Sequence, residues 1–422
     1  MATIAIAPPT PVVSDPRDPA HAHCPYRQAT LLQQALVSNK MRVGTFLGAG
    51  CPLAIRVPNG AWTKPLIPDI AGLTTEVREV IQASQNHKDR LENVLRRLKD
   101  SGIPVPNVEE ILSHVRALHE VIGTSNIDGL SKRDLDELDV EICRVTNDVV
   151  KVRLPSGDTP YHHLATWIGA IARVHAVEIF TSNYDLLMEQ ALEERKVPYF
   201  DGFVGSDRTF FDLTSMEQDN LPPRWARLWK VHGSINWWQS STGEIQRRAD
   251  APGDRLLIHP SHLKYTQSRR MPYLAMLDRL RAFLSAGQVV LMTCGYSFTD
   301  QHVNEIIFQG LSGNPKAICF GLLFGDRVKS PEAVAQARKH ANFSLLAADG
   351  AVLGTVDNDW HSIAKTEHAF HGLAVRTGDL AGRSISPIER CKFMLGDFRT
   401  LGDFLARELS SRGDTDDGND HD

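Results

Sequence analysis

The sequence predicts an α/β fold, built on a parallel sheet with helices on both faces and carrying an all-helical insertion. Short apolar runs of strand length alternate with stretches of helical periodicity, as in parallel strands joined by crossover helices. Four of these runs end in small or polar residues and lead directly into the next segment. Residues 74–152 carry helical periodicity alone, interrupted near 102–106 and 123–129. Such a sheet is Rossmann-like, with the insertion placed between two of its strands.

Composition narrows the class of protein. The chain has 422 residues, 42% hydrophobic and 23% charged, which is ordinary for a globular protein of two or three structural units. The net charge is -5, and the basic pairs at 247–248 and 269–270 are too short to form a basic stripe, so direct nucleic-acid binding is not expected. Apolar runs are too short to span a membrane and the N-terminus lacks a signal-peptide pattern, which predicts a cytoplasmic protein.

The six cysteines are scattered along the chain and form no CxxC pair. This spacing argues against a zinc module and against a disulfide framework. We therefore expect no metal site, and expect the cysteines to be buried as small hydrophobic residues.

The chain is expected to divide into four parts. These are a proline-rich N-terminal arm (1–28), a main α/β domain (29–330), a C-terminal extension packed on or beside the core (331–408) and an acidic disordered tail (409–422). The charge-rich faces of the insertion at about 74–152 are expected to face solvent or a partner.

Periodicity and turn residues place the individual elements. Strands are predicted at 42–47, 177–180, 227–231, 256–260, 289–292 and 317–324, with a loop at 264–265 and a strand pair around 343–356. Helices are predicted at 29–40, 160–171, 186–192, 272–285, 331–340 and 398–409, and one follows residue 300.

The first predicted strand ends in Gly48, Ala49 and Gly50. A Gly-x-Gly turn after a strand lets the backbone approach a phosphate closely and offers its amides to it. The dinucleotide fingerprint GxGxxG is incomplete, because Leu53 stands at its third glycine. A plain tight turn explains these residues equally well. The loop that follows, at 58–65, leads to Asp69 and is expected to cover the turn as a lid.

The second junction carries Ser182, Asn183 and Asp185 between a buried strand and a helix. Ligands bind at the carboxyl ends of strands in open α/β sheets, which makes these side chains candidates for a binding site. The simpler alternative is that Ser182 or Asn183 only caps the helix, since both are preferred N-cap residues.

Two further strands end in the same way. His232 follows the strand at 227–231, and Gly295, Tyr296 and Ser297 follow the strand at 289–292. A lone histidine is more often structural than catalytic, but its place at a strand end favours a site. A parallel sheet gathers the carboxyl ends of its strands along one edge, so we expect all four junctions to lie together.

The longer motifs around these junctions resemble the sirtuin family. They are FTSNYD (180–185), VPYFDGFVG (197–205), VHGSINW (231–237) and GYSFTDQHVN (295–304). The resemblance covers about residues 30–325 and is strongest to the sirtuin-like domain of bacterial anti-phage defence proteins, the sirtuin subunit of sirtuin–HerA systems. That branch hydrolyses NAD rather than deacylating lysine.

The resemblance implies roles for the candidate residues. Asn183 would hold the water and the ribose next to nicotinamide, and His232 would be the catalytic histidine. The pyrophosphate would be held by Gly48, Ala49 and Gly50, and the nicotinamide pocket would be shaped by Asp185. The adenosine side would be lined by Gly295, Tyr296 and Ser297. The NAD-binding set would be completed by Asp69 and Ser182. Asp69 departs from the family pattern, because its spacing is longer and the Phe and Arg that follow the family's acid are missing.

The implied activity is an NAD glycohydrolase (NADase) that releases nicotinamide and ADP-ribose, with NAD as substrate and no metal. Lysine-deacylating sirtuins carry a four-cysteine zinc module, and helical material stands in its place here, which argues against deacylation. The alternative is a nucleotide-sensing or scaffold subunit whose partner, an ATPase or nuclease, performs the chemistry.

The resemblance also implies partners. Uncontrolled NAD loss kills the host in abortive infection, so such domains are restrained until infection is sensed. We expect a homo-oligomer that acts with a separately encoded HerA-type hexameric ATPase, with a short Argonaute as second choice. The insertion and the N-terminal arm are the expected contact surfaces.

Overall fold

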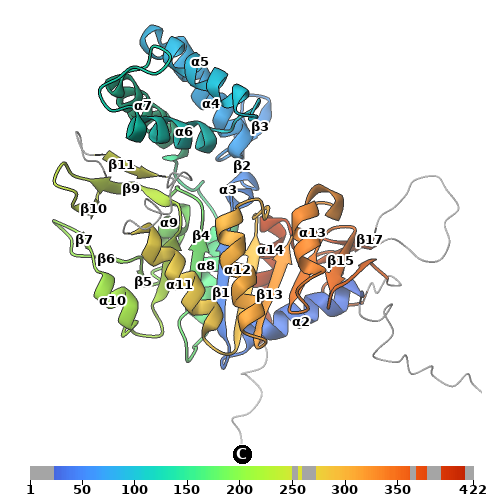
Figure 1. The fold of residues 1–422 in the computed structure, drawn as a ribbon. Helices are drawn as coiled ribbons and strands as arrows, with labels where there is room; N and C mark the ends of the chain where they lie inside the picture. The colour runs from blue at the N-terminus through green and yellow to red at the C-terminus, as the bar shows by residue number, and fades with distance from the viewer. Residues whose placement is uncertain (1–22, 250–254, 259–271, 362–366, 378–390, 414–422) are drawn as a thin grey trace, which may run out of the picture.

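The computed structural model describes residues 23–249, 255–258, 272–361, 367–377 and 391–413. Most of the predicted arm, the loop at 264–265 and residues 414–422 of the predicted tail lie outside the described residues. The α/β prediction is confirmed: a nine-stranded, mostly parallel sheet is flanked by helices (Figure 1). Among the helices described, none has the length and apolar character needed to cross a membrane.

The sheet has the strand order β16-β15-β14-β13-β12-β1-β4-β8-β5. Its central strand β1 (Arg42–Leu47) pairs in parallel with β12 (Val289–Cys294) and with β4 (Glu178–Thr181). Next to these, also in parallel, lie β13 (Ala317–Leu322) and β8 (Ala226–Lys230), and β5 (Tyr199–Phe200) closes one edge. The carboxyl ends of all these strands therefore meet at one edge of the sheet, as expected.

Alternating side chains along each strand feed two cores. In β12, Val290 and Met292 belong to one hydrophobic cluster, while Val289 and Leu291 belong to the other. The first cluster includes residues of α2 (Pro25–Val37), α8 (Pro160–Ala170), α9 (Leu187–Glu194) and α14 (Phe398–Gly413). The second includes residues of α11 (Tyr273–Ser285), α12 (Gln301–Gly313) and α13 (Pro331–Ala337). Strands buried on both faces need this near-continuous apolar sequence.

The C-terminal extension is part of the sheet itself. Its strand β14 (Phe343–Leu346) continues the parallel order beside β13, and β15 (Gly350–Leu353) and β16 (Val356–Asp359) follow in antiparallel pairing. Strands β17 (Val375–Thr377) and β18 (Cys391–Phe393) form a small separate sheet. Helix α14 packs on α8 and runs through Gly413, so the beginning of the predicted tail is helical.

The insertion consists of α4 (Ile70–Ala83), α5 (Gln85–Asp100), α6 (Val108–Val121) and α7 (Lys132–Val150). It begins at Ile70, earlier than predicted, because Asp69 caps the first turn. Capping boxes start α6, through Asn107 and Glu110, and α7, through Ser131 and Asp134. Figure 1 shows these helices as a lobe that projects from the sheet.

Several short elements differ from the prediction. The predicted lid loop is a hairpin of β2 (Arg56–Asn59) and β3 (Trp62–Pro65). Strand β9 (Gly233–Gln239), not predicted, follows His232 and pairs with β10 (Ile245–Arg247) and β11 (Arg255–Ile258) in a separate antiparallel sheet. Helix α2 begins at Pro25, inside the predicted arm.

The remaining elements are α3 (Gly50–Leu53), β6 (Phe203–Val204), β7 (Phe210–Phe211), α10 (Leu213–Gln218) and the 3-10 turn η1 (Arg327–Lys329).

Candidate active site

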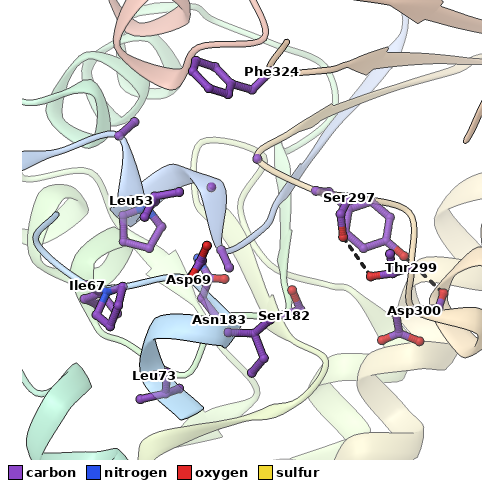
Figure 2. A pocket seen from close by; sticks show the side chains of 18 of the residues that line it. Leu53, Ile67, Asp69, Leu73, Ser182, Asn183, Ser297, Thr299, Asp300 and Phe324 are labelled. Carbon is purple, nitrogen blue, oxygen red and sulfur yellow. Dashed lines mark hydrogen bonds between the residues drawn. The ribbon is translucent and has the colours of Figure 1, made fainter. Parts of the chain in front are cut away.

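A cavity of about 1420 Å³ opens at the carboxyl edge of the sheet. The segments that follow β13, β12, β1, β4 and β8 line it, together with the start of α6 and the residues before α14. Figure 2 shows part of this lining, including Phe324 after β13, Ser297 after β12 and Asn183 after β4. Ten of the candidate residues are in its wall: Ala49, Gly50, Asp69, Ser182, Asn183, Asp185, His232, Gly295, Tyr296 and Ser297. Gly48 lies directly behind this wall, where it contacts Gly295.

The ends of β1 and β12 approach each other so closely that only glycine fits. A Cβ on Gly48 would lie 2.3 Å from the carbonyl oxygen of Gly295, and one on Gly50 would lie 2.7 Å from the Gly295 Cα. Gly295 has φ of +65°, a left-handed conformation that favours glycine. Because these glycines have no side chains, a ligand in the cavity could approach their backbone closely.

Two amides of the glycine turn are already used within the fold. Gly48 N donates to Cys294 O at 3.0 Å, and Gly50 N donates to Gly295 O at 2.9 Å. This corrects the expectation that the turn as a whole offers its amides to a phosphate. The glycines instead cross-link two strand ends, and the contribution of Gly48 to a ligand site is indirect.

Asn183 is held at the cavity wall by the neighbouring strand. Its Nδ2 donates to Gly48 O at 3.1 Å, and its backbone N donates to Thr181 Oγ1 at 3.0 Å. Thr181 Oγ1 in turn donates to Leu47 O at 2.8 Å. These bonds fix the amide plane of Asn183 and tie the ends of β1 and β4 together. The helix-cap alternative does not describe it, since α9 begins at Leu187.

The Asp185 side chain stabilises the turn that contains Asn183. It is buried, and its Oδ1 accepts from Leu187 N at 3.0 Å. Burial raises the pKa of Asp185, and the nearby Lys230 ammonium opposes the increase. Lys230 Nζ donates to the Asp185 carbonyl and pairs with Glu189 Oε1 at 2.9 Å. The turn that presents Asn183 is thus connected to the end of β8 by a buried cation.

His232 and Asp300 contact each other in the cavity wall, with 2.8 Å between His232 Nε2 and Asp300 Oδ2. The other oxygen of Asp300 caps α12, where it accepts from His302 N at 2.9 Å and Val303 N at 3.2 Å. Burial acts to lower the pKa of His232, but the hydrogen bond and charge of Asp300, with the charge of Glu109, outweigh it and raise the pKa. The arrangement is a histidine oriented by a fixed carboxylate.

The segment from Gly295 to Asn304 is braced internally. Tyr296 is buried between Phe46 and Phe298, and its hydroxyl donates to Asn304 Oδ1 at 2.8 Å. Asn304 Nδ2 donates to Phe298 O at 2.7 Å. Ser297 lies at the rim, 2.8 Å from Thr299 Oγ1 (Figure 2). The Tyr296 side chain therefore stabilises the loop.

Asp69 and Ser182 have simpler surroundings. Asp69 is exposed at the cavity edge and caps α4, where its Oδ1 accepts from Gly72 N at 2.8 Å. Ser182 is half-buried next to Asn183 (Figure 2). Capping accounts for Asp69 as well as a ligand role would.

Four acidic residues of the cavity were not assigned a role from the sequence: Glu109, Glu110, Asp300 and Asp397. Asp300 was noted within its motif without a function, although an acid at a helix start after a strand end is a recognisable pattern. Glu109 lies at the start of α6, with Asn107 and Glu110, in the wall of the same cavity. This end of α6 brings charged residues of the insertion to the cavity, in addition to the faces that were expected to face solvent or a partner.

Comparison with known proteins addresses the family. The family model of the SIR2-like domain matches residues 177–345. This stretch of the chain is therefore similar to a SIR2-like domain. The match runs from β4 into β14 and includes Asn183, His232 and the loop after β12. It leaves the glycine turn and the insertion outside. No curated protein sequence matches the chain.

Solved Sir2 structures are similar to the chain at low identity. One is a Sir2 homologue–NAD complex (13% identity, 75% of this chain and 87% of that chain, TM-score 0.31). Another, from work on the mechanism and regulation of Sir2 enzymes, has 13% identity, 70% and 85% coverage and a TM-score of 0.34. A Sir2 bound to acetylated peptide has 14% identity, 69% and 86% coverage and a TM-score of 0.31. These values are too low to transfer a residue role or a substrate to this chain.

A metal site requires several ligating side chains that lie close together, here within the described ranges 23–249, 255–258, 272–361, 367–377 and 391–413. Within those ranges, no three His, Cys, Asp or Glu side chains come together in a suitable cluster. Of the cysteines in the described part of the chain, all except the half-buried Cys24 are buried.

Proposed function

We propose that this SIR2-like chain hydrolyses the nicotinamide–ribose bond of NAD and releases nicotinamide and ADP-ribose. The observation that carries the proposal is the meeting of Asn183 and the His232–Asp300 pair in one cavity beside the glycine turn. An amide and an oriented histidine can position and activate a water molecule next to a sugar. The match of residues 177–345 to the family model of the SIR2-like domain supports NAD as the substrate.

The dimensions of the cavity fit an extended dinucleotide. The cavity wall runs from the end of β13 to the end of β8, and these two strands are four strand spacings apart in the sheet. At about 4.8 Å per spacing, this distance is roughly 19 Å. Leu323 and the exposed ring of Phe324 form an apolar end suited to a base, and Asn183 and His232 form the polar end. The glycine turn after the central strand lies between them, where a pyrophosphate would pass closest to backbone.

The proposed reaction needs little acid catalysis, because nicotinamide leaves NAD as a neutral ring. The carbon–nitrogen bond breaks with its electron pair on nicotinamide, and the ribose passes through an oxocarbenium-like centre. A water oxygen forms the new bond to that carbon while its proton passes to His232. Asn183 orients the water or the ribose hydroxyls, and Asp300 holds the imidazole and stabilises its protonated form.

The test is nicotinamide release from NAD by the purified chain, compared with Asn183→Ala and His232→Ala. We expect each variant to lose roughly a hundred- to ten-thousand-fold in rate while it remains folded. His175→Ala, a half-buried histidine outside the cavity lining, serves as the matched control and should keep full activity. NAD binding without release by the parent chain, alone or with a partner, would favour the sensing or scaffold function instead.

We further propose that the chain depletes NAD in the cytoplasm during anti-phage defence, as a homo-oligomer in complex with a HerA-type hexameric ATPase or, as second choice, a short Argonaute. Support comes from the sequence motifs that resemble the defence branch of the sirtuin family. Mass measurement of the chain purified with and without its co-encoded partner tests the assembly. Unchanged cellular NAD after phage infection would contradict the defence role.

A further inference from the structure

The helical insertion contributes residues to the reaction cavity. Asn107, Glu109 and Glu110, at the start of α6, all line it. Asn107 and Glu110 are engaged with each other: Glu110 Oε2 accepts from Asn107 N at 2.8 Å, and Asn107 Oδ1 accepts from Glu110 N at 3.0 Å. The capping box thus accounts for two of the three polar side chains, and Glu109 requires a separate explanation.

Glu109 is joined to the turn that presents Asn183. The hydroxyl of Tyr184 donates to Glu109 Oε1. Tyr184 is 7% exposed, and its carbonyl accepts from Ile235 N at 3.0 Å, so it is a rigid support. A carboxylate held by the residue that directly follows Asn183 is thus fixed in the wall of the cavity that Asn183 and His232 also line.

The charges around this centre are mainly negative. Asp300 from α12 and Glu109 from α6 act on His232, while Asp185 from the turn after β4 and His302 from α12 also line the cavity. One oxygen of Asp300 pairs with His232, and the other accepts a hydrogen bond at the start of α12. Asp185 is buried, and its carboxylate accepts a hydrogen bond from Leu187 N. Glu109 is the acid that the insertion adds to this set.

We propose that Glu109 is an electrostatic residue of the reaction site, whose carboxylate favours the positive charge that builds on the ribose and on His232. The proposal rests on the proposed NAD hydrolysis and deepens it: the insertion, outside the SIR2-like match, is part of the active site. Fixed charges aimed at developing charge, in a site with little water, lower a barrier most effectively. Tyr184 acts as the positioning residue that keeps the carboxylate in place.

The experiment compares Glu109→Gln and Tyr184→Phe with Glu92→Gln, an exposed glutamate on α5 of the same insertion. We expect Glu109→Gln to lower kcat about ten- to a hundredfold with little change in KM, because the lost interaction acts on the transition state. Tyr184→Phe should lose less, since the carboxylate remains, and Glu92→Gln should match the parent. Equal kcat for Glu109→Gln and the parent, at equal melting temperature, would overturn the proposal.

A second measurement separates this proposal from the NAD hydrolase itself. The His232 imidazole can be titrated by NMR in the parent and in Glu109→Gln, with His232→Ala identifying its signal. A lower midpoint in Glu109→Gln supports a charge acting at the centre, and an identical midpoint contradicts it. If the parent releases no nicotinamide under any condition, the proposed hydrolysis fails and this titration alone decides the role of Glu109.

Discussion

His232 and Asp300 join two distant strand ends, with 2.8 Å between the imidazole Nε2 and the carboxylate Oδ2. His232 follows β8 and Asp300 follows β12, and β4 and β1 lie between these strands in the sheet. Because the second oxygen of Asp300 accepts from His302 N and Val303 N, the start of α12 sets the direction in which the imidazole points. Orientation of the proposed base is therefore built into the helix cap.

The pair predicts a pH dependence. Burial acts to lower the pKa of His232, but Asp300 and Glu109 raise it above its usual value of about 6.5. A base must be neutral, so the rate of the parent should rise with pH through this raised pKa. Asp300→Asn keeps a capping side chain but removes the charge, which should move the acid limb of the kcat/KM profile to lower pH and reduce its plateau. An acid limb at the same pH in both proteins would contradict the role of Asp300.

Stability should depend on pH through the same pair. A histidine whose folded-state pKa is raised stabilises the fold fully below its unfolded pKa, and this stability is lost as pH rises through the folded pKa. We expect the difference in unfolding free energy between the parent and Asp300→Asn to be about 1.5–3 kcal/mol near pH 6. The difference should shrink by pH 9, where the imidazole is neutral. Urea unfolding at both pH values measures it, and a gap that widens with pH would rule the ion pair out.

Gly48 offers a test of the close approach between β1 and β12. In Gly48→Ala, the new Cβ would lie 2.3 Å from the carbonyl oxygen of Gly295, which the backbone can relieve only by moving. We expect a loss of at least about 1–3 kcal/mol in unfolding free energy, together with weaker ADP-ribose binding. Gly313→Ala, at the end of α12 with open space around its Cβ position, is the control and should be neutral or stabilising by about 0.4–1 kcal/mol. Equal stability of the two variants would disprove the steric argument.

Local sequence patterns were sufficient to predict the sheet edge on which the site is built. Each junction combines an apolar run with polar residues at its end, and parallel pairing then brings Asn183, His232 and Gly295 to one cavity. This inference needs only the direction of the strands. It does not need the strand order, which became known only from the structure.

Other features depend on tertiary contacts that short-range patterns do not contain. The contact of Glu109 with Tyr184 is set by how the start of α6 meets the turn after β4. The amides of Gly48 and Gly50 looked available because their acceptors, in Cys294 and Gly295, are far away in the sequence. Strand β9 was missed because its residues, Gly233–Gln239, mix polar and aromatic side chains and do not form an apolar run.

Breaking the buried pair of Lys230 and Glu189 by removing one partner should cost far more stability than breaking an exposed pair. Lys230 is 1% exposed and Glu189 is 7% exposed, so Lys230→Met leaves a carboxylate without its cation, at a cost of about 3–5 kcal/mol. Adding Glu189→Met should restore most of this, because the burial penalty of both charges disappears together. Arg144→Met, which removes an exposed partner of Glu141, should cost less than about 1 kcal/mol. Urea unfolding of the four proteins at pH 7 measures these differences, and a Lys230→Met cost no larger than that of Arg144→Met would contradict the pairing.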